Sequence, residues 1–398
     1  MRRVLLLFAA LAAFAAAGAQ PAGRAEHGPD RETFVYAVRD GDSLRLDRYP
    51  ALSSAAGARP CMIFLFGGGF LTGTRDNRRF LPYFRHFTAR GCDVVSIDYR
   101  LGMKRALDAG PIDGERFPGV LASTLAMATE DLRDATAFVC RRAAEWGVDP
   151  QRILTSGSSA GAMTVLMAEY ALCNGDSVFV RHLPEEFRYA GVIAYAGAVY
   201  DPSGELRWAT PPAPLLLFHG DADRNVPYDT VPVPGGGVLF GSAAVARDLA
   251  QRGVPYWFVS EAGADHSMAW RPMREHFAEI DAFLDRFVFG GERRRFETRP
   301  PTPPNGPRPL RSTTTSTPTT DTMFPGKNGS RPKHSEKDTV NENDPFDLSP
   351  MAGRRHRPVD SGTDARRRGA GLLPRGAAAR FPRSPHPSRS KKLKDFLN

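Results

Sequence analysis

Residues 152–163 read Arg-Ile-Leu-Thr-Ser-Gly-Ser-Ser-Ala-Gly-Ala-Met, and this stretch decides the predicted fold. It holds a Gly-x-Ser-x-Gly pentapeptide at 157–161, between a short apolar run and a helical pattern. A strand, a tight turn and a helix in that order expose Ser159 at the edge of a sheet, and the flanking glycines relieve the clash in the turn. A serine hydroxyl is a weak nucleophile at neutral pH, so this turn has catalytic meaning only if a base lies beside it.

Around this turn, short apolar runs alternate with helical patterns from about residue 31 to residue 290. This alternation predicts the α/β class, with a mostly parallel sheet of about eight strands flanked by helices. The expected strands cover residues 34–38, 44–49, 61–66, 94–97, 152–155, 192–195, 215–218 and 256–259, and the first two form an antiparallel hairpin. Helices are expected over 127–146, 160–172 and 273–289. The segments 101–126, 174–190 and 197–213 are expected to roof the site.

Residues 1–19 have the composition of a cleavable signal peptide. They begin with Arg2 and Arg3, continue with an apolar stretch and close on small residues, which is the order of a secretory signal. The alternative is a membrane anchor, but the apolar stretch is short for crossing a bilayer. We therefore expect export, either to the periplasm or to the outside of the cell.

Residues 291–398 are predicted to form a disordered tail, because they are rich in Pro, Arg, Ser and Thr and show no period that would bury a face. The tail has 23 Lys and Arg against 11 Asp and Glu, whereas the whole chain has 53 against 44, so the preceding residues are slightly acidic. A basic tail is suited to contact with anionic surfaces; a solvated linker or a mispredicted gene end is the alternative. Its basic clusters lack interleaved aromatic residues, so no specific nucleic-acid binding is expected.

The four cysteines, Cys61, Cys92, Cys140 and Cys173, leave two interpretations open. An exported protein with four cysteines can form two disulfides in any of three pairings, and buried free thiols are the alternative. No pair has the Cys-x-x-Cys spacing that is typical of a zinc site, so no metal is expected.

Backbone donors for an oxyanion are predicted in the glycine run at 67–69, which directly follows an uninterrupted apolar strand. Residues without side chains let N–H groups converge on one oxygen without obstruction. In a serine site built on a strand–turn–helix, one donor comes from such a loop and another from the residue after the nucleophile. The candidates are therefore Gly68, Gly69 and Ala160. The glycines at 235–237 do not follow a predicted strand and are expected to be an ordinary loop.

The expected base is His266, and the acid that orients it is expected at Asp221 or Asp223. Each lies in a loop that directly follows a predicted strand, and both carboxylates qualify by their chemistry. The carboxyl ends of parallel strands lie along one edge of a sheet, where substrate sites of α/β proteins gather. We therefore predict that Ser159, a carboxylate and the histidine meet, in the chain order Ser, Asp, His.

Residues 31–290 resemble the α/β-hydrolase superfamily, particularly its carboxylesterase-like and hormone-sensitive-lipase-like branches. Three motifs carry the resemblance: Phe66-Gly67-Gly68-Gly69-Phe70 looks like the His-Gly-Gly-Gly loop, Asp98-Tyr99-Arg100-Leu101 resembles the strand-end signature, and His219-Gly220-x-x-Asp223-x-x-Val226-Pro227 is similar to the segment that carries the acid. On this match, Asp223 is chosen over Asp221. The departure is Phe66, where a histidine is common. That histidine is not part of the triad, so the change concerns the geometry of the loop.

The resemblance implies an exported serine hydrolase that cleaves carboxylic esters through Ser159, His266 and Asp223 by way of an acyl-enzyme, without a cofactor. Its expected partner is a small-molecule or polysaccharide-linked ester, for example an acetyl or feruloyl ester. Two alternatives stay open. A serine peptidase is disfavoured because the segment before residue 31 has no room for a propeller, and a catalytically silent binding protein because every triad position is filled. Acyl and alcohol specificity and oligomeric state are not readable from the sequence.

Overall fold

A computed structural model describes residues 31–52 and 57–299 of the chain. The predicted signal peptide at 1–19 lies outside the described residues, and so does the predicted tail from residue 300 onward.

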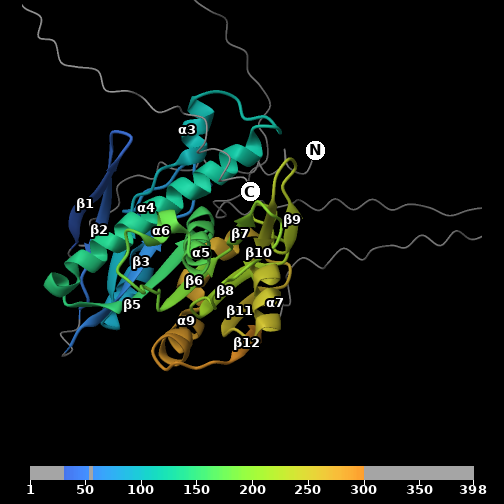
Figure 1. The fold of residues 1–398 in the computed structure, drawn as a ribbon. Helices are drawn as coiled ribbons and strands as arrows, with labels where there is room; N and C mark the ends of the chain where they lie inside the picture. The colour runs from blue at the N-terminus through green and yellow to red at the C-terminus, as the bar shows by residue number, and fades with distance from the viewer. Residues whose placement is uncertain (1–30, 53–56, 300–398) are drawn as a thin grey trace, which may run out of the picture. The chain divides into compact units, whose positions relative to one another are not determined.

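A nine-stranded sheet lies at the centre of the described part, with the strand order β1-β2-β4-β3-β5-β6-β8-β11-β12 (Figure 1). The strands are β1 (Glu32–Arg39), β2 (Asp42–Tyr49), β3 (Arg59–Leu65), β4 (Asp93–Ile97), β5 (Val148–Ser158), β6 (Gly191–Tyr195), β8 (Leu215–Gly220), β11 (Tyr256–Glu261) and β12 (Arg295–Thr298). The pairs β1–β2 and β2–β4 are antiparallel, and all later pairs in the sheet are parallel. The predicted α/β class, the opening hairpin and the mostly parallel sheet are confirmed.

Helices cover the sheet, because strands that pair in parallel need a crossover between them. The helical segments are η2 (Arg78–Phe80), α2 (Leu81–Ala89), α3 (Gly102–Asp108), α4 (Phe117–Trp146), α5 (Ala160–Cys173), α6 (Ser177–Val180), α7 (Ser242–Arg252), η3 (His266–Ala269), α8 (Pro272–Glu275), α9 (Phe277–Phe283) and η4 (Leu284–Val288). The long α4 and α5 pack on each other and on β5 (Figure 1). Every residue of β6 and β8 is buried, which explains the uninterrupted apolar runs of these strands.

Two predicted helices have different bounds in the structure. α4 begins at Phe117 rather than at residue 127, with Pro118 in its first turn, where the missing N–H of proline costs no helical hydrogen bond. The helix expected over 273–289 is divided, because the backbone of His276 (φ −115°, ψ 35°) leaves helical geometry between α8 and α9.

The domain boundary predicted at residue 290 is too early. β12 pairs in parallel with β11 beyond that boundary, so residues 295–298, which the tail prediction included, belong to the sheet. Phe296 anchors the strand, with its ring centroid 5.4 Å from that of Trp257 and 5.6 Å from that of Phe287. One apolar residue among charged neighbours is too weak a pattern to indicate a strand from sequence.

A second, three-stranded antiparallel sheet was not predicted. It has the order β7-β10-β9, with β7 (Ala198–Asp201), β9 (Thr230–Pro232) and β10 (Val238–Gly241). The glycines at 235–237 lie in the turn between β9 and β10, where Gly235 and Gly237 have φ angles of 86° and 72°. The expected ordinary loop is therefore confirmed. Whether the segments 101–126, 174–190 and 197–213 roof the site remains a prediction.

All four cysteines are free thiols, so the alternative of two disulfides is excluded in this structure. Cys61, Cys92 and Cys173 are buried, and burial raises the pKa of the half-buried Cys140 thiol to about 11. These thiols pack as small apolar residues, and their thiolate forms are suppressed at neutral pH.

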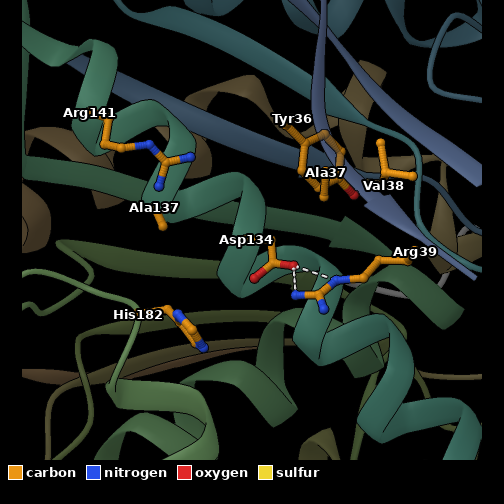
Figure 2. Close-up of a pocket in the computed structure, with 8 residues that line it drawn as sticks. All are labelled: Tyr36, Ala37, Val38, Arg39, Asp134, Ala137, Arg141 and His182. Atoms are coloured by element: carbon orange, nitrogen blue, oxygen red, sulfur yellow. Dashed lines mark hydrogen bonds and ion pairs between the residues drawn. The ribbon is translucent and has the colours of Figure 1, made fainter. Parts of the chain in front are cut away.

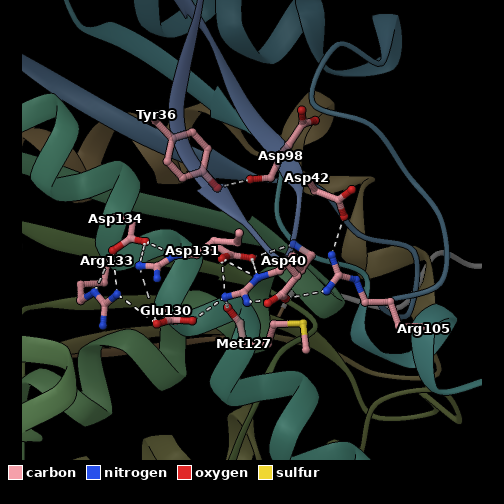
Figure 3. Close-up of polar contacts among 12 residues, drawn as sticks. Tyr36, Asp40, Asp42, Asp98, Arg105, Met127, Glu130, Asp131, Arg133 and Asp134 are labelled. Carbon is pink, nitrogen blue, oxygen red and sulfur yellow. Dashed lines mark hydrogen bonds and ion pairs between the residues drawn. The ribbon is translucent and has the colours of Figure 1, made fainter. Parts of the chain in front are cut away.

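A buried ion pair joins Arg100, in the segment after β4, to α4; Figure 3 labels its partners Asp131, Glu130 and Asp40. The Arg100 backbone N–H donates to Asp131 Oδ2 at 2.7 Å, and its side-chain Nε–H donates to Asp131 Oδ1 at 2.9 Å. The Asp131 carboxylate is fully buried, and the Arg100 side chain is 6% exposed. Glu130 and Asp40 also contact the guanidinium. The Asp98-Tyr99-Arg100-Leu101 signature therefore joins the segment after β4 to α4.

We expect Asp131→Ala to lower the free energy of unfolding by about 3 kcal/mol, because it strips the buried Arg100 of a charge partner. Urea denaturation followed by circular dichroism measures the change. The matched control is Arg105→Ala, which removes exposed pairs with Asp42 and Asp40 in the same cluster and is expected to cost less than about 1 kcal/mol. Equal losses in the two variants would contradict the argument.

Candidate active site

Ser159 lies in the turn between β5 and α5, with a backbone conformation (φ 51°, ψ −115°) that is rare for a residue with a side chain. The flanking glycines make this turn possible. A Cβ at Gly157 would lie 2.3 Å from the carbonyl oxygen of Gly161, and a Cβ at Gly161 would lie 2.3 Å from that of Leu65. The glycines therefore let the turn close on itself and let α5 begin directly against the end of β3.

His266 lies between Ser159 and Asp223. Its Nε2 is 2.8 Å from Ser159 Oγ, and its Nδ1 is 2.7 Å from Asp223 Oδ2. The three residues follow β5, β8 and β11, so they come from the carboxyl ends of parallel strands. An ionised carboxylate only accepts hydrogen bonds, so Nδ1 carries the proton and Nε2 is free to accept one from the serine.

The carboxylate of Asp223 is buried and well supplied with donors. Its side chain has no exposed surface, and Oδ1 accepts hydrogen bonds from the N–H groups of Asn225 at 2.8 Å and Val226 at 3.1 Å. Burial by itself would raise the pKa of Asp223, but the hydrogen bonds from His219 and His266 outweigh it and hold that pKa well below its ordinary value. Asp223 is therefore charged at neutral pH.

Asp221, the other carboxylate considered from the sequence, has a different place. Its Oδ1 accepts a hydrogen bond from the N–H of Gly263 at 2.6 Å, and its own N–H donates to the carbonyl of Glu261 at 3.1 Å. Both nitrogens of His266 are already engaged by other side chains. Asp221 therefore fastens the loop after β8 to the loop after β11 and does not orient the histidine.

The glycine loop after β3 lies against the nucleophile. A Cβ at Gly67 would be 3.2 Å from Ser159 Cβ, which places the loop beside the serine. Gly68 (φ 129°) and Gly69 (φ 64°) have backbone conformations that favour glycine, and a Cβ at Gly68 would be 2.2 Å from the carbonyl oxygen of Thr72. The loop thus needs glycine both for its path and for its packing.

Ala160 is the first residue of α5. The first N–H groups of a helix have no acceptor within the helix, and the helix dipole favours negative charge at this end. The N–H of Ala160 is therefore available at the residue directly after Ser159, and its role as an oxyanion donor stays a prediction.

Phe66 fixes the glycine loop by aromatic packing. Its ring stacks on that of Tyr99 with centroids 4.5 Å apart, and the Tyr99 hydroxyl donates to the Phe66 carbonyl at 2.7 Å. A Cβ at Gly73 would be 2.3 Å from the Phe66 ring, so the loop folds closely over it. The loop is therefore anchored by these contacts at the position where the related motif has a histidine.

Sequence reasoning missed two supports of the site. The Ser158 hydroxyl donates to the carbonyl of Ala269 at 2.6 Å, which ties the residue before Ser159 to the end of η3, the segment that His266 begins. His219, which was quoted only as part of a motif, is buried beside Asp223. Its place four residues before Asp223 in that motif is the one sequence feature that could have drawn attention to it.

We expect Gly68→Ala to lower kcat for the predicted ester hydrolysis by about 100-fold or more, because the added methyl group displaces a backbone donor of the predicted oxyanion site. Initial rates on a chromogenic ester measure the effect. The matched control is Gly235→Ala, which also replaces a glycine of positive φ (86°) but lies in the β9–β10 turn. An unchanged kcat in Gly68→Ala would remove this loop from the oxyanion site.

A separate pocket of about 280 Å³ lies on β1 and α4 (Figure 2). Its lining consists of Tyr36, Ala37, Val38, Arg39, Asp134, Ala137, Arg141 and His182, none of which is a predicted site residue. Arg39 and Asp134 are paired with each other there. In the part of the chain that the structure describes, no three His, Cys, Asp or Glu residues are grouped to hold a metal ion, and none of the helices there has the length and apolar character of a membrane span.

Comparisons with known proteins find esterases and a lipase among the similar sequences. Residues 46–199 match the family model described as BD-FAE, a stretch that includes the glycine loop and Ser159 and ends before Asp223 and His266. The chain is 33% identical over 118 residues to a probable isoprenylcysteine alpha-carbonyl methylesterase of Oryza sativa subsp. japonica, covering 30% of this chain and 23% of that protein. It is 30% identical over 123 residues to the fumonisin B1 esterase of Sphingopyxis macrogoltabida, covering 30% of this chain and 22% of that one.

A longer match, 27% identical over 219 residues, is to secreted lipase 1 of Botryotinia fuckeliana, with 52% of this chain and 31% of the lipase covered. Among solved structures, a thermophilic esterase of Thermogutta terrifontis matches with a TM-score of 0.47 and 23% identity, over 66% of this chain and 96% of that one. The chain thus spans between about a fifth and a third of the length of these three sequence relatives.

Proposed function

We propose that this chain, which belongs to the carboxylesterase-like part of the α/β-hydrolase superfamily, cleaves carboxylic esters through Ser159, His266 and Asp223. One observation carries the proposal: an unbroken series of contacts joins Ser159 Oγ through the imidazole to a buried carboxylate. This arrangement gives the weak nucleophile a base whose tautomer is fixed, and it stabilises the imidazolium that forms.

The proposed reaction has two stages. His266 Nε2 takes the proton of Ser159 as its oxygen attacks the ester carbonyl carbon, and backbone N–H groups of Gly68 or Gly69 and of Ala160 bind the resulting oxyanion. The intermediate collapses, the alcohol leaves with the proton from His266, and the acyl group stays on the serine. Water then attacks the acyl-enzyme, with His266 again as base, and the carboxylic acid is released.

The relatives share a bond type rather than a substrate. Their names describe a methylesterase, a fumonisin esterase and a lipase, and no single substrate is common to these names. The proposal is therefore an ester of a small molecule or of a polysaccharide, with acetyl and feruloyl esters as the first to assay. A peptidase of the same fold is the alternative that the assay must separate.

The test traps the nucleophile. Purified protein is assayed on p-nitrophenyl acetate and butyrate and on a peptide anilide, and is then treated with a fluorophosphonate. We expect ester hydrolysis, loss of that activity in step with labelling, and one phosphonyl group on the peptide that contains Ser159. Labelling elsewhere would contradict the assignment of the nucleophile, and hydrolysis of the anilide alone would favour the peptidase.

We also propose that the protein is exported, with cleavage of residues 1–19, and that the basic C-terminal segment contacts anionic surfaces. The support is the order of charged, apolar and small residues at the N-terminus and the excess of Lys and Arg beyond residue 291. Mass spectrometry of the protein recovered outside the cytoplasm tests the cleavage and the presence of the C-terminal segment, and sedimentation with anionic vesicles tests the surface contact. A mature protein that still begins at Met1 would contradict cleavage.

A further inference from the structure

A second buried histidine shares Asp223 with His266. His219 is the second-to-last residue of strand β8, and its side chain has no exposed surface. Its Nε2 lies 3.3 Å from Asp223 Oδ2, the same oxygen that lies 2.7 Å from His266 Nδ1. Asp223 Oδ2 therefore has two imidazole neighbours, of which only His266 contacts Ser159.

The neighbours of His219 place its proton. Nε2 lies 3.3 Å from Asp223 Oδ2 and 3.3 Å from the carbonyl oxygen of Val226, and both of these atoms only accept hydrogen bonds. Nε2 must therefore carry a hydrogen. Nδ1 lies 2.8 Å from the hydroxyl of Ser242, which can donate or accept. His219 thus presents its Nε2–H between the carbonyl of Val226 and the carboxylate of Asp223, while Ser242 on α7 holds the other side of the ring.

Few other groups in the described residues face the His219 ring. The ring of Tyr228 meets it edge-on with centroids 5.7 Å apart, and Ser242 Oγ lies 3.4 Å from the carbonyl oxygen of Gly197. The carboxylate of Asp223 is the charged group that His219 contacts directly, and His266 lies on the far side of that carboxylate. An effect of His219 on catalysis must therefore pass through Asp223.

We propose that His219 is a positioning residue: its Nε2–H holds Asp223 Oδ2 in the place where that oxygen meets His266 Nδ1. The inference rests on the ester hydrolysis proposed above. The other oxygen, Oδ1, is held by two backbone N–H groups. The contact with His219 then limits rotation of the carboxylate that would move Oδ2 away from His266. A buried carboxylate that loses a donor is also less stable in its charged form, and the charged form is the one that orients the histidine.

The first experiment compares two replacements of His219 that have similar size. His219→Met fills the space without a donor, and His219→Gln has an amide N–H that reaches toward Asp223. A hydrogen bond to a charged group typically accounts for about a 10- to 100-fold effect, so we expect kcat on p-nitrophenyl acetate to fall by about that factor in His219→Met. KM is expected to change little, because His219 does not touch substrate, and His219→Gln is expected to recover most of kcat.

A double-mutant cycle separates positioning from plain packing. If His219 acts through Asp223, then His219→Met has no further effect on kcat once Asp223→Asn is present. Additive losses would overturn the inference. The matched control is His86→Met, which removes another histidine–carboxylate contact, the one of 2.7 Å to Asp281 between α2 and α9. It is expected to lower thermal stability and leave kcat unchanged.

A readout without substrate distinguishes this inference from the proposed function. The far-downfield proton NMR resonance of the His266–Asp223 hydrogen bond is expected to shift or broaden in His219→Met and to stay in place in His219→Gln. If the resonance responds but the wild-type protein hydrolyses no ester, the proposed function fails and the positioning role stands. If it does not respond, the positioning role is overturned. Should His219→Met fail to fold, Ser242→Ala removes the partner that orients the ring and is read in the same way.

Discussion

Ser159→Ala is expected to lower kcat for p-nitrophenyl acetate by at least about 10⁴-fold, because nucleophile, base and acid act as a unit and the residual rate comes from oxyanion binding alone. Alanine keeps the Cβ that already occupies the turn, so the strained backbone at φ 51° stays as it is. Steady-state rates and thermal unfolding of both proteins measure the effect, and the unfolding midpoint is expected to change little.

The control for this variant is Ser123→Ala, on the exposed side of α4, where the hydroxyl donates only to the carbonyl of Val120. Its activity is expected to match the wild type. Substantial hydrolysis by Ser159→Ala would mean that another group attacks the ester, and the assignment of the turn as a nucleophile site would then be wrong.

The sequence predicted the centre of the fold well for a physical reason. β6 and β8 are buried on both faces, so their apolar runs have no polar interruption and their bounds are easy to find. The candidate residues could be placed together because parallel strands end at one edge, even though Ser159 and His266 are far apart in the chain. The resemblance to the family motif favoured Asp223 over Asp221 as the acid. In the structure Asp223 contacts His266, whereas Asp221 contacts the backbone of Gly263.

Other parts of the molecule had no strong signal. β12 pairs with one neighbour at the edge of the sheet and buries little, so its charged sequence resembles the tail that follows it. The small sheet of β7, β9 and β10 consists of strands of three or four residues, which are too short to show a period. The contact of His219 with Asp223 forms because the chain turns back after β8. This turn is a property of the fold, and the local sequence pattern does not show it.

Asp223→Asn is expected to lower kcat by about 10⁴-fold at neutral pH, since an amide no longer fixes the tautomer in which Nδ1 carries the proton and Nε2 accepts it. The variant also tests the electrostatics. The folded pKa of Asp223 is depressed, so its contribution to stability is present above pH 4 and is lost as the pH falls further. The difference in unfolding midpoint between wild type and variant is therefore expected to narrow between about pH 4 and pH 2.

Asp221→Asn is the matched control, because it makes the same chemical change two residues away in the same loop. Asp221 accepts a backbone N–H from Gly263, and an asparagine oxygen can accept that hydrogen bond as well. We expect its kcat to stay within about threefold of the wild type, because the asparagine keeps the hydrogen bond that the aspartate accepts. If the large loss followed Asp221→Asn instead, the acid would have to be reassigned, and the contact of 2.7 Å between Asp223 and His266 would need another explanation. Because the same chemical change is made two residues apart in one loop, the comparison of the two variants shows which of these carboxylates orients the imidazole.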